Sequence, residues 1–561
     1  MFGVKDDFKT PFGRGGTFCN RPVRDRTFAE ASAWNLPVWT IGSVRSVLQH
    51  ALAQSRALCP RADQQVWSMA QLMPRVNIDR VLGHRRVLQA EDAADLAASI
   101  LRAGGTPTAH VALSAPRSRH AGLARMIGSR LREEVSSFSR ARLHRIAALL
   151  DPKHAASHEA LAFASVAEGV ARGTSIPSVG VRAALRLGRS IRVTCPVRID
   201  LCGGWSDTPP ICHEQGGTVV NAAITLAGRQ PVCVEARLIE EPLIRLRSID
   251  QGRNLTISDA LAARSHHDPH DWAALPKAAL LLAGITHRHG NLSRRLRAFG
   301  GGLELTMSVA VPKGSGLGTS SILGAAVLAC LDGVCGKKAS VRSLIERTSV
   351  LEQMMSTAGG WQDQAGGITP GFKMLRTRAG ADQTPRIQRL NVPSRALREL
   401  QERSLLYYTG QRRLAKNILQ GVVRRYLSGE PAALRIIGDL KAAAEAMARD
   451  LVRGDINAFA RGVLRNWELK KAIDPGSTNT RIEGILRTIE SRLTGYELAG
   501  AGGGGFIFLV ARSARDAKAV KRILGRNRAG DASLVEFAWD GEGLRVDVIA
   551  TATGPSRHPH R

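Results

Sequence analysis

A glycine-rich turn between a strand and a helix is the feature that most constrains this chain. The segment 312–321 reads PKGSGLGTSS, after an alternating run at 303–309 and before an apolar run at 323–331. These two periodicities predict a strand and a helix. Glycines let backbone N–H groups approach a phosphate chain, and the start of a helix adds its dipole and unpaired donors. The segment therefore predicts a phosphate-binding loop, although it is neither a Walker A motif nor G-x-G-x-x-G.

Composition narrows the class of protein. The 561 residues are 44% hydrophobic, enough for about two to four domains with a sizeable core. No apolar run approaches the ~20 residues that span a bilayer, and the first residues lack the apolar core of a signal peptide, so we expect a cytoplasmic protein. The net charge of +31 is spread along the chain and aromatic residues are only 4%, which favours anionic ligands over a nucleic-acid partner. The eight cysteines form no C-x-x-C pair and are expected to be reduced.

The pattern along the chain predicts five parts. Residues 1–40 are expected to be an irregular leader, and 41–180 a mainly helical region that ends in a Gly/Pro-containing linker at 173–180. Strand and helix patterns are then mixed, which predicts an α+β fold with a first lobe at 190–385 and a second at 386–553. The tail 554–561 is expected to be disordered. The helical region has no catalytic constellation, and we interpret it as a packing or docking region.

A second motif lies upstream, at 196–210, where a strand ends in a double glycine and two prolines stiffen the following loop. That loop carries Trp205 and Asp207. A carboxylate there is suited to accept hydrogen bonds from ligand hydroxyls, and an indole to pack on the apolar face of a sugar. The alternative is an ordinary turn with a buried tryptophan and a solvated aspartate.

Two more glycine clusters follow. In 359–367 glycine pairs bracket Asp363, which we interpret as a carboxylate on a backbone that can approach a ligand closely and as a group suited to take a hydroxyl proton. Glu352 precedes it by eleven residues, late in a predicted helix. The segment 500–505 has five glycines in six positions, which favours a backbone that lies against another loop.

Together the three motifs, 196–210, 312–321 and 498–506, resemble those of the GHMP small-molecule kinases, and they occur in the family's order. Within the family, RIDLCGGWSDTPP and GGWQDQ are similar to the motifs of L-fucokinases. So is YYTG at 407–410, followed by Arg413, Ala415, Lys416 and Asn417. The resemblance covers about 190–553. It implies a ribosomal-protein-S5-like first lobe, a ferredoxin-like second lobe, and ATP and Mg²⁺ as cofactors.

The resemblance also implies roles for individual residues. Asp363 is expected to be the catalytic base, Arg198 to stabilise the transition state, and Ser320 and Glu352 to hold Mg²⁺. The expected sugar-binding residues are Trp205, Ser206, Asp207, Thr208, Gly360 and Trp361. The residues expected to bind the ATP phosphates are Lys313, Gly314, Ser315, Gly316, Leu317, Gly318, Thr319, Ser320 and Ser321, with Gly502, Gly503 and Gly504 as the third-motif loop.

The substrate prediction rests on one departure from the galactokinases, which carry Glu-His before the aspartate where this chain has Gly204-Trp205. The lost polar groups argue against galactose, and an indole suits the methyl group of a 6-deoxy sugar. We therefore predict phosphorylation of the anomeric hydroxyl of L-fucose or a close analogue.

Three alternatives stay open. Arg412, Arg413 and Lys416 would suit the second phosphate of a heptose 7-phosphate, the substrate of another GHMP kinase. A catalytically silent regulator and a nucleic-acid-binding protein are the alternatives of other classes. Some fucokinases are fused to a pyrophosphorylase, but the ~190 upstream residues look too short and too helical for one. We thus expect kinase activity alone, with a separate nucleotidyltransferase or a second copy of the chain as a partner.

Overall fold

The computed structural model describes residues 78–171 and 181–550, and four two-residue strands before them: β1 (Thr17–Phe18), β2 (Arg21–Pro22), β3 (Trp39–Thr40) and β4 (Val66–Trp67). Within 181–550 it leaves out 260–261, 263–265, 267, 269–270, 288–289, 313, 356–358, 412–414 and 527–530. The predicted linker at 173–180, the predicted tail, Lys313, Arg412 and Arg413 lie outside the described residues, as do the leader apart from β1 to β3 and the side chains of Lys416 and Asn417. The chain forms two compact units, Met1–Ala93 and Ala94–Arg561.

Apart from the two-residue strand β4, the described part of the predicted helical region is made of helices and their short connections. It consists of α3 (Ile78–Arg102), α4 (Ala109–Ser114), α5 (Arg117–Glu133), α6 (Ser137–Leu150) and α7 (Ala155–Ala171). Ser136 caps α6, because its side chain accepts a hydrogen bond from the Ser139 amide. The apolar side chains on one stripe of α6 are buried against α4 and α5, as an amphipathic helix requires.

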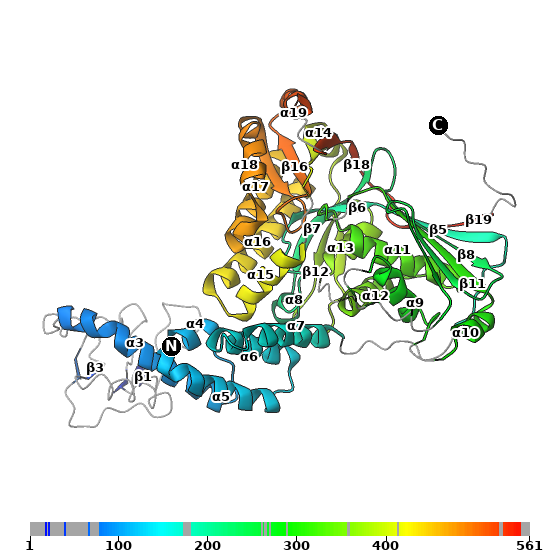
Figure 1. Ribbon diagram of the computed structural model, residues 1–561. Helices are drawn as coiled ribbons and strands as arrows, with labels where there is room; N and C mark the ends of the chain where they lie inside the picture. The colour runs from blue at the N-terminus through cyan, green and yellow to red at the C-terminus, as the bar shows by residue number, and fades with distance from the viewer. Residues whose placement is uncertain are drawn as a thin grey trace. The chain divides into compact units, whose positions relative to one another are not determined.

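The first lobe is built on a six-stranded sheet beside helix α11, which Figure 1 shows mostly in green, with its last strand, near the C-terminus, in red. Its strand order is β10 (Arg253–Ile257), β9 (Ile244–Ser248), β11 (Gly302–Val309), β8 (Val232–Ile239), β5 (Arg189–Cys195) and β19 (Arg545–Ala550). The strands are antiparallel except that β11 and β9 run parallel. Side chains alternate along β8, and the buried set faces α11 (Thr319–Val334), so one face of the sheet forms the core and the other stays open.

A second sheet carries the predicted sugar-binding motif. Its order is β13 (Arg386–Arg389), β12 (Phe372–Arg376), β7 (Thr218–Leu226) and β18 (Phe537–Trp539), with β6 (Val197–Cys202) also paired to β7. The β-rich run 193–201 is divided between two strands in two sheets, because Pro196 has no N–H to continue the ladder. The helices of this lobe are α8 (Ile211–Gln215), α9 (Ala274–Leu282), α10 (Leu292–Phe299), α11, α12 (Val341–Met354) and α13 (Gln362–Ile368).

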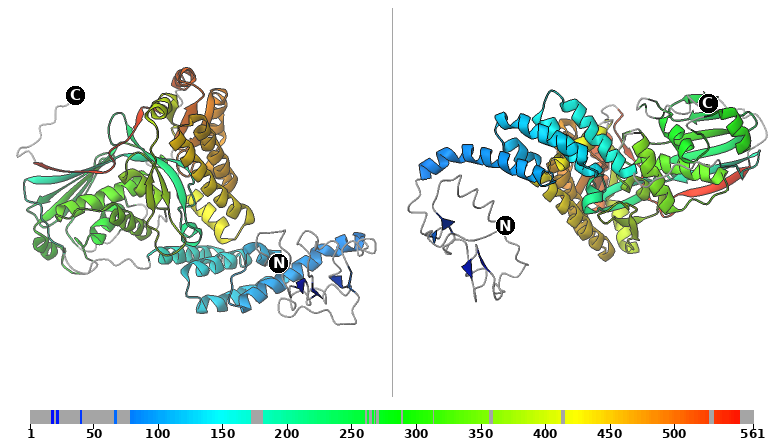
Figure 2. Two further views of the ribbon diagram at one scale, coloured as in Figure 1. Left: turned by 180° about the vertical axis from the view of Figure 1, so that it is seen from behind. Right: turned by 90° about the horizontal axis from the view of Figure 1, so that it is seen from below.

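The second lobe has a four-stranded sheet in the order β15 (Leu493–Leu498), β16 (Phe506–Ala511), β14 (Ser404–Tyr408) and β17 (Ser533–Val535). Its helices are α14 (Ser394–Arg403), α15 (Ala415–Leu427), α16 (Pro431–Arg453), α17 (Ile456–Ile473), α18 (Thr480–Arg487) and α19 (Ala514–Arg526). Figure 2 shows α16 and α17 packed side by side as the longest part of this helical layer.

The end of the described chain returns to the first lobe. Strands β18 and β19 lie within the segment 386–553 that sequence order assigns to the second lobe, yet they pair with β7 and β5. Pairing covers the edge of β5, whose backbone N–H and C=O groups would otherwise lie open. None of the helices among the described residues is both long enough and apolar enough to cross a membrane.

Candidate active site

The predicted phosphate loop joins β11 to α11. Gly314, Gly316 and Gly318 have φ values of 71°, 83° and 72°, which residues other than glycine rarely adopt. Gly318 stands at the N-cap of α11 and offers no side-chain cap, so the first N–H groups of the helix are left for another acceptor. The loop thus presents the donors and the helix dipole that bind phosphate groups.

The third motif lies directly against this loop. A Cβ on Gly505 would come within 2.3 Å of the Ser315 carbonyl oxygen, and one on Gly316 within 2.1 Å of the Ala499 carbonyl oxygen. The Phe506 amide donates to the same Ser315 oxygen at 3.1 Å. The close approach expected from the glycine run is therefore present, and backbone contacts alone make it.

The glycines at the centre of the third motif support it from the other side. Gly503 donates its amide to the Ser477 carbonyl, and a Cβ on Gly502 would come within 2.5 Å of that oxygen. A Cβ on Gly504 would come within 3.0 Å of the Gln411 carbonyl oxygen. The third-motif loop is thus held between the phosphate loop and the end of α17.

Asp363 and Arg198 meet beside the phosphate loop. The Arg198 guanidinium donates to Asp363 Oδ1 from Nε at 3.0 Å and from Nη2 at 2.6 Å, and its Nη1 donates to the Gly316 carbonyl at 2.7 Å. A Cβ on Gly318 would lie 3.2 Å from the Asp363 side chain. The Arg198 side chain is 3% exposed whereas that of Asp363 is 29% exposed, so the carboxylate is the member of the pair that solvent and a ligand reach.

Burial alone would lower the pKa of Arg198, but the negative charges of Asp363 and Asp200 outweigh it and raise the pKa. Asp363 lies in the first turn of α13. Gly366 and Gly367 belong to this helix because it packs closely: a Cβ on Gly366 would lie 2.7 Å from Asn221 Nδ2, and one on Gly367 2.4 Å from the Ile322 side chain. The glycines here allow close helix packing rather than a flexible turn.

Two further carboxyl groups lie under the double glycine that precedes Trp361. A Cβ on Gly359 would be 2.6 Å from Glu352 Oε2, and one on Gly360 1.9 Å from Asp207 Oδ2. Burial, followed by the negative charge of Asp363, raises the pKa of Asp207 to about 7. Burial and the same charge raise the pKa of Glu352 to about 8, although a hydrogen bond from Ser321 opposes the shift. The site thus gathers carboxyl groups, and a bound cation would favour their charged forms.

The carboxylate of Glu352 and the hydroxyl next to it suit a magnesium ion, which prefers hard oxygen ligands. The side chain that donates to Glu352 is that of Ser321, and it is buried. Ser320, the residue expected to hold the metal, is exposed at the start of α11. Its metal role stays a prediction, and Ser321 is the hydroxyl that the structure brings to the carboxylate.

The residues expected to bind a sugar are mostly buried. Ser206 is fully enclosed, and its hydroxyl bonds the backbone of Gly203 and Thr218. Trp205 packs among apolar side chains of α15, α16 and α17 and has a φ of 77°, a conformation that costs energy and persists only where the surroundings impose it. Thr208 and Trp361 are each 3% exposed. Their contacts with a sugar stay predictions, and in this structure they form the layer that supports the site.

Sequence reasoning missed the residues that hold this layer. The Gln362 side chain donates to Asp207 Oδ1 at 3.1 Å and so joins the second motif to the Asp363 helix. Lys470 on α17 lies 2.9 Å from Asp200 Oδ2 and 3.1 Å from Glu497 Oε2, with all three side chains no more than 1% exposed. Gln362 lies inside the GGWQDQ motif, so the motif itself could have indicated a role for it. No pattern in the sequence around Lys470 indicates that Asp200 and Glu497 are its partners.

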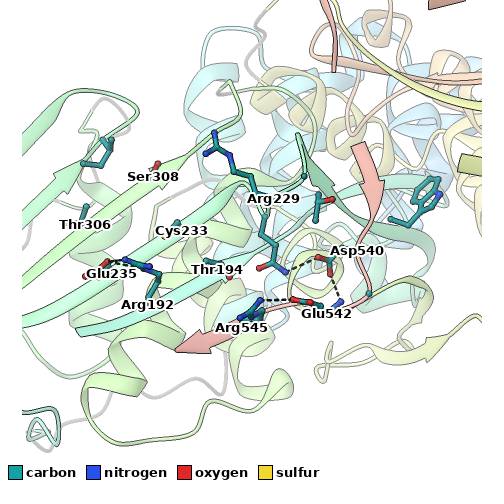
Figure 3. Close-up of a pocket in the computed structure, with 16 residues that line it drawn as sticks. Arg192, Thr194, Arg229, Cys233, Glu235, Thr306, Ser308, Asp540, Glu542 and Arg545 are labelled. Atoms are coloured by element: carbon teal, nitrogen blue, oxygen red, sulfur yellow. Dashed lines mark hydrogen bonds and ion pairs between the residues drawn. The ribbon is translucent and has the colours of Figure 1, made fainter. Parts of the chain in front are cut away.

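A hollow of about 810 Å³ lies elsewhere, on the open face of the six-stranded sheet (Figure 3). In it Arg192 pairs with Glu235 at 3.0 Å and Arg545 with Glu542 at 3.2 Å, so positive and negative charges largely offset each other. None of the predicted site residues lines it. The chemistry-bearing residues therefore lie away from this hollow, around the phosphate loop.

Comparison with known families agrees with this geometry. Residues 285–371 match the model of the GHMP kinases N-terminal domain, and 447–529 match that of the GHMP kinases C-terminal domain. This chain carries both domains of a GHMP kinase. The first match contains the phosphate loop, Glu352 and Asp363, and the second contains the third motif, so the mixed α/β fold of the two lobes is that of this family.

Three curated proteins are similar to this chain. An L-fucokinase/L-fucose-1-P guanylyltransferase of Bacteroides fragilis is 38% identical over 68% of this chain and 40% of the relative. A bifunctional fucokinase/GDP-fucose pyrophosphorylase of Arabidopsis thaliana is 33% identical over 62% and 32%. A D-glycero-alpha-D-manno-heptose 7-phosphate kinase of Campylobacter jejuni is 23% identical over 64% and 98%. The matched part of the chain thus spans well under half the length of the two fucokinase relatives.

Proposed function

We propose that this GHMP kinase transfers the γ-phosphoryl group of ATP to the anomeric hydroxyl of L-fucose or a close analogue. The observation that carries the reaction class is the placement of Asp363: its partly exposed carboxylate stands beside Gly318 of the phosphate loop and is fixed there by Arg198. The motifs at 196–210 and 359–364 and the two fucokinase relatives support the choice of sugar.

The chemistry needs little beyond positioning and charge neutralisation. Asp363 accepts the proton of the anomeric hydroxyl while that oxygen bonds to the γ-phosphorus, and the bond to the β-γ bridging oxygen breaks to release ADP. Arg198 holds the base and the Gly316 carbonyl together, which fixes the base relative to the phosphates. A bound Mg²⁺, held by Glu352 with serine hydroxyls of α11, would neutralise phosphate charge.

On the sugar side, Asp207 lies under Gly360 and bonds Gln362, next to the base in sequence. In this proposal Asp207 and the rest of the 203–208 loop determine where the sugar hydroxyls bind. Trp205 holds this loop in place through its buried apolar contacts. The apolar surroundings of that loop are suited to a 6-deoxy sugar.

A heptose 7-phosphate is the second candidate substrate. The Campylobacter jejuni relative named for it is matched along 98% of its length, in contrast to the partial matches with the fucokinases. This substrate would need basic groups for its second phosphate, and Arg412 and Arg413 stand in sequence just before α15. The reaction and the base are the same in both candidates, and only the sugar differs.

The proposed role extends to partners and location. The relatives named as bifunctional join a fucokinase to a nucleotidyl-transferring activity. We expect the product of this chain, a sugar 1-phosphate, to be taken up by such an activity on a separate cytoplasmic protein.

The test is ADP release by the purified chain with Mg·ATP and a panel of L-fucose, D-arabinose, galactose, mannose and heptose 7-phosphate, with Asp363→Asn as the control. Turnover confined to L-fucose and close analogues supports the proposal. Turnover with the phosphorylated heptose alone overturns the substrate but keeps the base. No turnover with any sugar, with ATP still bound, favours a silent regulator.

A further inference from the structure

The short helix α8 and the predicted sugar loop form one piece of structure. The Cys212 amide donates to the Thr208 carbonyl at 3.1 Å, and the Glu214 amide donates to the Pro210 carbonyl at the same distance. Ile211 at the start of α8 belongs to the same apolar cluster as Trp205. A shift of α8 would therefore be transmitted directly to the loop that carries Asp207.

Helix α8 has only five residues, too few to be stable without external contacts. Two consecutive side chains of α8 contact α6 of the helical region. The Arg142 guanidinium donates to both carboxylate oxygens of Glu214, and the Phe138 ring stands 4.9 Å from the His213 ring. The helical region thus supplies the outer support of α8.

Helix α15 completes this support. Its Tyr426 hydroxyl donates to Glu214 Oε2 at 2.7 Å, and the Arg142 guanidinium lies 5.1 Å from the centre of the Tyr426 ring. Glu214 therefore receives hydrogen bonds from two elements, and both of its donors are partly or fully buried. Hydrogen bonds to a charged group that is partly shielded from water are stronger than those on an open surface.

The two faces of α15 separate the site from the helical region. Ile418 and Val422 pack in the cluster that contains Trp205, whereas Val423 and Leu427 pack with Ala141, Ala162 and Val166 of α6 and α7. Ion pairs add to this second contact, because Glu159 of α7 joins Arg145 of α6 at 2.9 Å and Arg424 of α15 at 3.0 Å. The contacts of α6 with the kinase lobes thus concentrate on α8 and α15, next to the sugar loop.

We propose that α6 and α7 are a positioning element for the sugar side of the site, with Arg142 as the positioning residue that fixes α8 through Glu214. The substrate class in this inference rests on the proposed sugar kinase activity. The helical region then sets the affinity for the sugar while leaving the ATP loop, which the third motif supports, unaffected.

The experiment compares Arg142→Met with Arg140→Met in the full chain. Arg140 lies on the same helix but pairs with Glu168 of α7, inside the helical region. Arg142→Met is expected to raise KM for the sugar about threefold to tenfold and to leave KM for ATP within about twofold, whereas Arg140→Met leaves both unchanged. Glu214→Gln, which keeps the size of the side chain, is expected to act as Arg142→Met does, and the double variant to be no worse than either single one.

A second readout does not depend on the substrate. Backbone amide hydrogen exchange over 208–216 is expected to speed up in Arg142→Met and Glu214→Gln but not in Arg140→Met. Equal exchange and equal sugar KM in Arg142→Met and Arg140→Met would overturn the inference. An inactive wild-type chain would instead count against the proposed function, and the exchange result would still decide whether Arg142 holds α8.

Discussion

The nucleotide side and the sugar side of the candidate site are held by different kinds of contact. On the nucleotide side the phosphate loop and the third motif touch through backbone atoms, and Gly316 and Gly505 leave no room for a Cβ. On the sugar side the contacts run through buried side chains, with Gln362 holding Asp207 and helices α15 to α17 enclosing Trp205. Backbone contacts tolerate almost no substitution, whereas side-chain contacts can be exchanged. The difference suggests that the family can change its sugar while keeping its phosphate loop.

The largest effect is expected at the boundary between the two sides. Asp363→Asn should lower kcat by about 10²- to 10⁴-fold, because it removes the group that accepts the hydroxyl proton. KM for ATP should change little, since the third motif also holds the phosphate loop through backbone contacts. Steady-state ADP release, with titration of a fluorescent ATP analogue, measures both. A kcat within tenfold of the wild type would show that the reaction proceeds without this base.

Next in size is a test of the backbone contact on the nucleotide side. Gly505→Ala places a Cβ about on top of the Ser315 carbonyl and strains a φ of 86°, so we expect KM for ATP to rise at least about tenfold with the sugar KM nearly unchanged. Gly438→Ala is the matched control, because a Cβ there, in the middle of α16, meets nothing within 4 Å. It should stabilise the chain by about 0.5–1 kcal/mol. A wild-type KM for ATP in Gly505→Ala would contradict the claim that the backbone contacts on the nucleotide side tolerate almost no substitution.

Trp205→His tests the side-chain contact on the sugar side. Replacing a buried indole in an apolar cluster should lower the free energy of unfolding by about 3 kcal/mol, measured by urea titration. At a temperature where the variant stays folded, the preference should shift from L-fucose toward galactose. Trp205→Phe serves as the control that keeps an apolar ring. Unchanged selectivity in Trp205→His would remove Trp205 from the determinants of specificity.

The smallest expected effect is on pH dependence. The pKa of Asp207 is raised to about 7 by burial and by the charges of Asp363 and Asp200, above its ordinary value of 3.8. The folded state therefore binds the proton more tightly, so Asp207 contributes a loss of stability as pH rises from about 4 to 7. Asp207→Asn should lose part of that slope in unfolding curves measured between pH 4 and pH 8. Parallel curves for both proteins would contradict the raised pKa.

The nucleotide side was the part most accessible from sequence. A positive φ strains any residue other than glycine, so Gly314, Gly316 and Gly318 stand out in the chain itself. The strand and helix on either side were also predicted, because each has a clear period, and both family domain matches agree with the two-lobed α+β fold.

The structure of the sugar side was harder to predict from the sequence, for a physical reason. The partners that bury Trp205 lie on α15, α16 and α17, two hundred or more residues further along the chain. Its burial is therefore a tertiary property with no local pattern. Nor does the sequence show what the glycines of the Asp363 helix approach: Gly366 and Gly367 allow close packing against Asn221 and Ile322. The return of β18 and β19 to the first lobe likewise depends on distant strand edges.

The buried Lys470 bears on how ligands enter the protein. Its ammonium group joins Asp200 on β6 to Glu497 on β15, and Asn466 on the same helix bonds both Glu497 and the Gly203 amide. Separating the lobes along this line would leave buried charges without their partners, which costs about 3–5 kcal/mol in such pairs. These buried ion pairs and the apolar core that both lobes share hold the two lobes together. Opening the site by local loop movement would leave these ion pairs intact and would therefore cost less than a hinge movement between the lobes.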